Sequence, residues 1–265
     1  MVLRDKLMLL PETPRCKYTL APLHEVLCQL SFPRLLKLET ELPNIFQERL
    51  LQDFPFFEER KNIALSVKTD NEGANDEIER TTKKVFEFIS EDRNWKISLQ
   101  SDSIALTCSK YDKWEDFSKK ITHAFDNLVD IYGIKNITRV GLRYKDVIDR
   151  EILGTELTWN KLLKPHIAGV YGILEDSPSI ESQFSNFILK LDNVDGRVQV
   201  NHGLVEKVGD NHHYAYLIDG DFFCEGSINK DEAYEQLSKF NVEARKLFRW
   251  SISDELHELL QPTDL

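Results

Sequence analysis

Three cations and a glycine occupy alternate positions in one stretch of this sequence, Ile137-Thr-Arg-Val-Gly-Leu-Arg-Tyr-Lys-Asp146. Alternation of apolar and polar residues is typical of a β-strand, in which residues two apart point to the same face. Arg139, Arg143 and Lys145 would then share one face, and Tyr144 would lie on the other. An arginine guanidinium can bind a carboxylate or a phosphate through two parallel hydrogen bonds. The segment therefore predicts a binding site made of Arg139, Arg143, Tyr144 and Lys145.

Two uses of these cations stay open. In a regular strand Arg139 and Arg143 lie roughly 13 Å apart, a separation that suits an extended anion or an acidic patch on a partner better than a single carboxylate. Gly141 between them leaves room for a ligand to approach the backbone. Alternatively, the cations pair with acids of neighbouring strands on a solvated sheet face, an arrangement that is common and contributes little.

Other candidate groups have weaker spacing. His212 and His213 are adjacent, so a strand would direct them to opposite faces, and no HxH or HExxH pattern accompanies them. Glu59-Arg-Lys61 has the final acid-x-lysine spacing of a nuclease site, but no clear metal-binding acid precedes it. A metal-dependent hydrolase or nuclease would have to use dispersed acids such as Glu25, Asp146 and Asp192.

Familiar catalytic motifs are absent from the sequence. It holds no GxxxxGK(S/T) loop, GxGxxG fingerprint or GxSxG elbow, and its 11 glycines disfavour a loop that cradles a nucleotide. The four cysteines are far apart and form no CxxC pair, so we expect reduced structural thiols and no zinc knuckle. These patterns predict no cofactor and favour a noncatalytic protein.

Composition narrows the class of protein. Hydrophobic residues make up 41% and charged residues 30% of the 265 residues, as in an ordinary globular protein. The formal net charge of −11 disfavours broad nucleic-acid binding, which needs a basic surface, although a local basic patch stays compatible with it. The N-terminus is too charged for a signal peptide, and no apolar run approaches the roughly 18 residues of a membrane span. We therefore expect a cytoplasmic protein that does not associate with membranes.

Hydrophobic periodicity divides the chain into two similar rounds of elements. The first round has a strand at 24–32, a helix at 42–50, strands at 63–67, 82–90, 95–99 and 104–108, and a long helix at 112–131 that ends at Gly133. Residues 70–80 hold five acids and no apolar period, which indicates an exposed loop. The second round has a strand at 137–148, a helix from 158, strands at 182–191, 198–205 and 213–223, a long helix at 229–248 and a short helix at 251–260.

This order predicts an α+β fold: an antiparallel, curved sheet with long helices packed on one face. Strand, helix, strands and long helix, taken twice, is the element order of the TATA-binding-protein fold. The similarity lies in element order alone and carries no functional implication. We expect an internal duplication with two α+β halves, residues 1–135 with an extended lead-in and residues 136–265, packed as one compact unit.

Some motifs resemble those of a known family. Pro22-Leu-His-Glu-Val26, the spacing Tyr111-x-x-Trp114-x-x-Phe117 and Arg139-Val-Gly-Leu-Arg-Tyr144 together resemble a sporadically distributed bacterial and archaeal family of about this length. The resemblance covers nearly the whole chain and brings no established activity, cofactor or catalytic residue. The family's patchy distribution implies an accessory role, such as one in defence or in mobile elements.

Three functions follow as expectations. The first is a noncatalytic binding or regulatory module that acts through a protein partner, with a homo-oligomer left open. The second is a metal-dependent hydrolase or nuclease that uses the dispersed acids. The third is a small-anion sensor that uses Arg139 and Arg143.

Overall fold

The computed structural model describes residues 10–69, 76–174, 179–192, 194–206 and 214–264, and the side chains of these residues except 62–82. The chain divides into two compact units. The terminal unit contains residues 1–26, 140–225 and 231–265, and the hairpin unit contains residues 27–139 and 226–230. The units are interleaved along the chain, since the first 26 residues cluster with residues that follow 140. The division into halves 1–135 and 136–265 stays a prediction.

Five strands in the order β3-β4-β5-β6-β2 make the sheet of the hairpin unit. They are β2 (Leu23–Ser31, here from Leu27), β3 (Phe56–Thr69), β4 (Asp76–Ile89), β5 (Trp95–Gln100) and β6 (Ser103–Cys108). The helices of the unit are α1 (Lys37–Thr40), α2 (Asn44–Leu50) and α3 (Trp114–Tyr132).

The apolar stripe predicted for the long helix is buried in α3. Phe117, Ile121 and Phe125 are fully buried, and residues spaced by three and four lie on one face of a helix. Gly133 ends α3 in the left-handed conformation at φ 66°, and its N–H donates to the carbonyl of Val129 at 2.8 Å. The predicted helix and its end are therefore confirmed.

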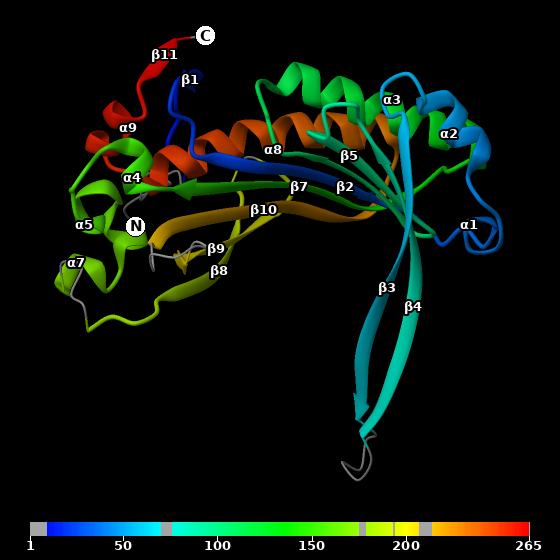
Figure 1. Ribbon diagram of the computed structural model, residues 1–265, viewed down its shortest axis with the longest axis horizontal. Helices are drawn as coiled ribbons and strands as arrows, with labels where there is room; N and C mark the ends of the chain where they lie inside the picture. The colour runs from blue at the N-terminus through cyan, green and yellow to red at the C-terminus, as the bar shows by residue number, and fades with distance from the viewer. Residues whose placement is uncertain (1–9, 70–75, 175–178, 193, 207–213, 265) are drawn as a thin grey trace, which may run out of the picture. The chain divides into compact units, whose positions relative to one another are not determined.

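A long hairpin is the most extended element of the hairpin unit. Strands β3 and β4 have 14 residues each and pair antiparallel from Phe56↔Ile89 to Thr69↔Asp76, and the ribbon leaves the rest of the unit (Figure 1). The loop predicted at 70–80 is wrong for Asp76–Arg80, which lie in β4. A ladder is made by the main chain, so acidic residues without an apolar period can still pair. Residues 70–75 lie outside the described part.

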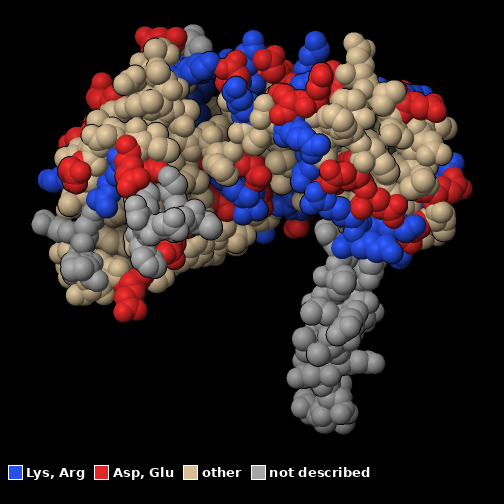
Figure 2. Space-filling model, in the orientation of Figure 1, with Lys and Arg blue, Asp and Glu red and all other residues tan. Residues whose placement is uncertain are grey.

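Basic side chains gather where this hairpin leaves the sheet (Figure 2). The register places Lys61 opposite Lys84 and Arg60 one pair further toward the sheet. Lys83 forms an ion pair with Asp102 at 2.6 Å, and Lys84 donates to the carbonyl of Glu39 at 2.9 Å. Several of these cations are therefore held by groups of the same unit.

The terminal unit has its strands in the order β2-β7-β10-β9-β8. They are the start of β2, β7 (Ile137–Ile148, here from Val140), β8 (Phe184–Lys190), β9 (Arg197–Glu206) and β10 (Tyr214–Ile228, here to Glu225). A separate two-stranded sheet joins β1 (Cys16–Tyr18) to β11 (Pro262–Asp264). The helices are α4 (Arg150–Leu153), α5 (Trp159–Leu162), α6 (Pro165–Ala168), α7 (Tyr171–Leu174), α8 (Lys230–Ser251, here from Asp231) and α9 (Asp254–Leu259).

Helix α8 covers one face of this sheet. Phe240 of α8 packs on Phe222 of β10, with ring centroids 6.2 Å apart. A Cβ atom at Gly220 would lie 2.8 Å from the Leu247 side chain, so glycine lets α8 approach β10 closely. Since side chains alternate along a strand, Asp219 and Asp221 point to the opposite face.

The α+β class with a large antiparallel sheet is confirmed. The order of strand, helices, strands and long helix occurs twice, but four strands stand between the helices of the first round and three in the second. That order alone does not confirm an internal duplication. All four cysteines are free, and Cys28 and Cys108 are fully buried. Within the described part, no helix combines the length and apolar character needed to cross a bilayer.

Candidate functional site

Arg143 forms an ion pair with Asp219, from β7 to β10. Its Nε donates to Oδ1 at 2.7 Å and its Nη2 to Oδ2 at 2.5 Å. The Arg143 side chain is 36% exposed, whereas that of Asp219 is only 5% exposed. Hydrogen bonding to Asp219 raises the pKa of Arg143 above its ordinary value. The bidentate fork predicted to grip an anion is thus occupied by a buried carboxylate of the same chain.

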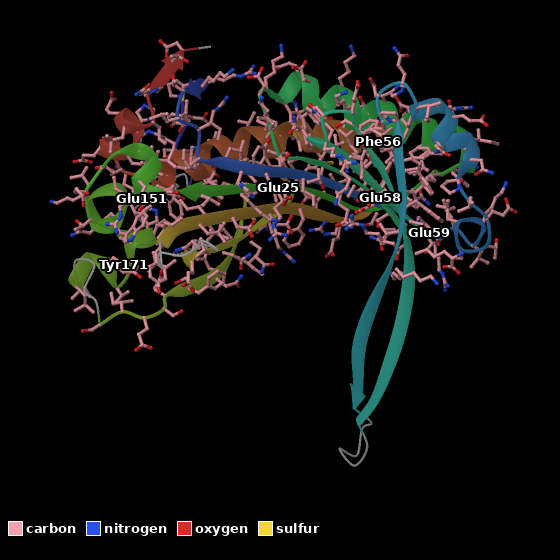
Figure 3. All side chains as sticks on the ribbon, in the orientation of Figure 1. Glu25, Phe56, Glu58, Glu59, Glu151 and Tyr171 are labelled. Atoms are coloured by element: carbon pink, nitrogen blue, oxygen red, sulfur yellow. The ribbon has the colours of Figure 1, made fainter. Side chains whose placement is uncertain are left out.

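Lys145 also has a carboxylate partner. Its Nζ lies 2.5 Å from Oε1 of Glu25 on β2, and both side chains are about one-quarter to one-third exposed. Figure 3 labels Glu25 on that strand. Tyr144 points to the other face, where its hydroxyl donates to Oδ1 of Asn241 on α8 at 2.8 Å. The predicted alternation of β7 is therefore present, and it separates Tyr144 from the two cations.

Arg139 belongs to the hairpin unit. Its Nη1 donates to Oε1 of Gln29 on β2 at 3.5 Å, and its side chain is half-buried. The four predicted binding residues are thus divided: Arg143 and Lys145 lie in the terminal unit on one face of β7, Tyr144 lies on its other face, and Arg139 lies in the other compact unit. A shared site of all four stays a prediction.

A polar row crosses the sheet of the terminal unit and includes residues that the sequence did not suggest. Asp219 pairs directly with Asn201 of β9, and Asn201 with Asn186 of β8. Directly paired residues of antiparallel strands point to the same face. The amide of Asn186 donates to the side-chain oxygen of Asn201. The row Arg143, Asp219, Asn201 and Asn186 therefore ends at β8, and only the strand register could have revealed it.

Asp146 is the most unusual acid of the terminal unit. It is buried in strand β7. Burial, and secondly the charge of Asp219, raise the pKa of Asp146 to about 7. A carboxyl group with this pKa changes between its neutral and charged forms near neutral pH.

The acids of the hydrolase alternative are not brought together in the described part. Glu25 is paired with Lys145, Asp146 is buried, and Asp192 is exposed after β8. Within the described ranges, no group of three or more histidine, cysteine or acidic side chains is arranged to hold a metal ion. His212 and His213 lie outside the described residues.

Glu59 of the acid-x-lysine pattern lies on β3 and is exposed (Figure 3). The adjacent Arg60 is engaged by Glu58 at 3.0 Å and by Glu87 at 2.8 Å. Glu87 is buried and also contacts Lys96 at 3.0 Å. The polar groups beside Glu59 thus form ion pairs of a sheet face.

No protein-family model and no curated protein matches this sequence. The resemblance carried by the motifs around Val26, Trp114 and Arg143 therefore stays untested.

Proposed function

We propose that this chain is a noncatalytic binding module that acts through a protein partner, and that the partner holds the β3–β4 hairpin. One observation carries the proposal. Strand β5 pairs with β4 only over Phe86–Ile89, whereas β3 and β4 stay paired out to Thr69↔Asp76. The ribbon beyond β5 is roughly 30 Å long at about 3.3 Å per residue.

A two-stranded ribbon of this length has little stability of its own. Isolated hairpins are marginal in water, and three strands or packing on a helix are usually needed. Within the described part, β3 is the last strand of its sheet, and no third strand accompanies the ribbon beyond Phe86. Its edges therefore offer main-chain donors and acceptors along their length, the groups that proteins use when a strand of a partner is added.

The charges near the hairpin favour a protein over a nucleic acid as partner. The sequence of residues 70–80 holds five acids, which a phosphate backbone would repel. The cations at its base already form ion pairs within the chain: Arg60 with Glu58 and Glu87, and Lys83 with Asp102. Mixed charges of both signs contribute to the orientation and specificity of protein complexes. An accessory role in defence or in mobile elements rests on the motif resemblance alone.

The anion-sensor alternative has less support, because the Arg143 guanidinium would have to release Asp219 to bind a ligand. The metal-dependent alternative has no ligand set among the described residues. Both alternatives stay testable by melting shifts with inorganic phosphate and by phosphodiester hydrolysis in Mg²⁺ or Mn²⁺.

The experiment is a shortening of the hairpin. Residues 65–80 are replaced by Asn-Gly, which favours a two-residue hairpin turn and keeps Ala64 opposite Thr81. The tagged variant is expressed in the source cells beside the full chain. We expect a mixed complex to be recovered with the full chain and lost with the shortened variant, whose melting temperature should stay within about 3 °C, since the removed ribbon contributes little to the core. Equal recovery with both chains would contradict the proposal, as would metal-dependent hydrolysis by a chain that recovers no partner.

A further inference from the structure

Strand β8 leaves one edge of the terminal unit's sheet open. It is the last strand in the order β2-β7-β10-β9-β8, and its only strand neighbour in the described part of the chain is β9. An edge strand exposes a row of N–H and C=O groups that can pair with another chain.

Two hydrogen bonds fix which residues of β8 direct their main chain outward. The N–H of Leu204 donates to the carbonyl of Gln183 at 3.0 Å, and the N–H of Leu191 donates to the carbonyl of Gly196 at 3.1 Å. Odd-numbered residues of β8 therefore direct their main-chain groups to β9, because this direction alternates along an antiparallel strand. The even-numbered residues direct theirs to the open edge: Phe184, Asn186, Ile188 and Lys190.

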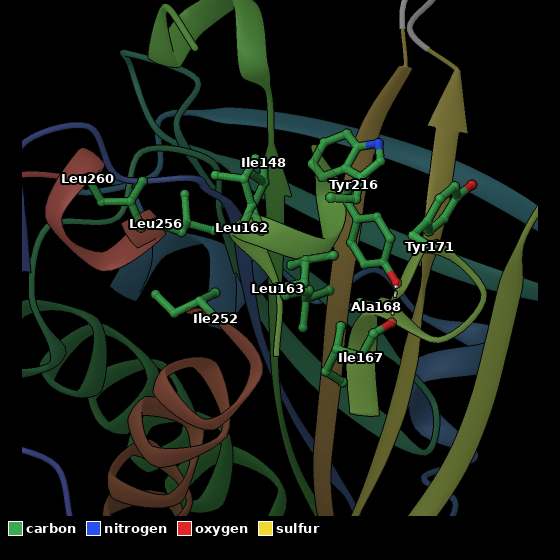
Figure 4. Packing of buried hydrophobic residues seen from close by; sticks show 12 residues of the cluster. Ile148, Leu162, Leu163, Ile167, Ala168, Tyr171, Tyr216, Ile252, Leu256 and Leu260 are labelled. Carbon is green, nitrogen blue, oxygen red and sulfur yellow. Dashed lines mark hydrogen bonds between the residues drawn. The ribbon is translucent and has the colours of Figure 1, made fainter. Parts of the chain in front are cut away.

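The side chains of this edge are unusually apolar. Phe184 is 60% exposed and Ile188 is 55% exposed. Phe187 is half-buried against the buried cluster shown in Figure 4 and packs on His202, with ring centroids 5.7 Å apart. Edge strands are usually protected by charge, proline or a covering element, yet Lys190, at the end of β8, is its one charged residue.

Strand β3, the outer strand of the hairpin unit's sheet, is charged where β8 is apolar. Residues Glu58, Glu59, Arg60 and Lys61 of β3 place consecutive charges where that strand lies beside β4. Such charges disfavour pairing with a second copy. Of the two outer strands, β8 is thus the one whose described side chains suit pairing.

We propose that β8 pairs antiparallel with β8 of a second copy of this chain, with Phe187 opposite Phe187 of that copy. This register places Asn186 opposite Ile188 and Phe184 opposite Lys190, and each outward-directed residue meets another outward-directed residue. Pairing of this kind is isologous, since the same patch serves both copies.

The strand is complementary to itself in this register. Four outward-directed residues on each copy give roughly eight interchain hydrogen bonds, because each hydrogen-bonded pair exchanges two. The two Phe187 rings meet in a non-hydrogen-bonded pair, where side chains approach most closely. Lys190 can lay its aliphatic stem and ammonium group over the exposed Phe184 ring. The pairing places a side chain of the second copy beside each of the two most exposed apolar side chains of the strand, Phe184 and Ile188.

The interface is narrow, so the dimer should be concentration-dependent. A single pair of edge strands falls at the low end of specific interfaces, below about 1,200 Å² of total buried area. We expect a dissociation constant on the order of 10 μM, which sedimentation equilibrium can measure. Sedimentation of the wild-type chain as a monomer up to about 300 μM, thirty times that constant, would overturn the proposal.

The main-chain pairing is tested by two substitutions at one position. Ile188→Pro removes an outward N–H and leaves the ladder to β9 intact, so it should weaken the dimer at least about 100-fold, since the change acts twice in each dimer. Ile188→Thr keeps the N–H and the β-branched shape and should weaken it by less than about 10-fold. Dimerisation of Ile188→Pro as strong as that of Ile188→Thr would overturn the pairing.

The register is tested by crosslinking, which does not depend on a variant that weakens association. An equimolar mixture of Asn186→Cys and Ile188→Cys chains should form a disulfide between residues 186 and 188, whose Cα atoms lie roughly 5.5 Å apart in such a pair. Each variant alone should crosslink at least about 10-fold more slowly, because the like positions are offset along the strand. No crosslink in the mixture, or crosslinking of each variant alone as fast as that of the mixture, would overturn the register.

The chain with the shortened hairpin should dimerise unchanged, so a failure of the β8 pairing is distinct from a failure of the hairpin proposal.

Discussion

Arg143 and Asp219 are joined by two hydrogen bonds, although 76 residues separate them in the chain. The carboxylate is buried, whereas the guanidinium is partly exposed to solvent. Its geometry favours a structural role for Arg143, because releasing the arginine would leave a buried charge without its partner.

Replacing Arg143 with glutamine should therefore lower the free energy of unfolding by about 1–3 kcal/mol, less than for a fully buried pair because Arg143 is partly exposed. Urea denaturation measures this change. The double variant with Asp219→Asn should lose less than the sum of the single variants. Unchanged stability of Arg143→Gln would instead restore the anion-binding role of this residue.

Asp146 predicts a pH dependence of stability. Burial raises the pKa of Asp146 in the folded chain to about 7, above the value near 3.9 expected when the chain unfolds. The folded state binds this proton more tightly, so its contribution is fully present below about pH 4 and is lost as the pH rises through about 7.

Asp146→Asn keeps the neutral form at every pH. At pH 8 it should raise the free energy of unfolding by about 1–3 kcal/mol, with the difference from wild type shrinking toward pH 4. Chemical denaturation at both pH values measures it, with the exposed Asp192→Asn as the matched control. A larger gain at pH 4 than at pH 8 would show that the carboxyl is stabilised in its charged form.

Proline should prevent folding when it replaces a residue of an interior strand, and should be tolerated at an outward-directed position of an outer strand. Val140 is fully buried in β7, which lies between β2 and β10. Val140→Pro removes a ladder donor and should cost about 3 kcal/mol or more, enough to prevent folding of a marginal domain. Ile188→Pro on β8 should fold. Circular dichroism and solubility of the two purified chains check this, and a folded Val140→Pro chain with unchanged melting would contradict the interior position of β7.

Local patterns in the sequence predicted β7, α3 and the stop at Gly133, because alternation, helical spacing and a glycine cap act over a few residues. The sequence underestimated the length of the β3–β4 hairpin, because Asp76–Arg80 have no apolar period and are held in β4 by main-chain pairing with β3. The polar row was also missed. Asp219 meets Asn201 only through the register of β10 on β9, which is set by long-range pairing and not by local spacing.

Amide hydrogen exchange of the β3–β4 ribbon tests the central claim most directly. In the purified chain, the amides of residues 62–69 and 76–85 should exchange with little protection, since a two-stranded ribbon opens readily. In the complex recovered from cells, the same amides should gain at least about 100-fold protection, while those of β7 stay unchanged. A complex that protects other surfaces and leaves the ribbon exchanging as in the free chain would contradict the account.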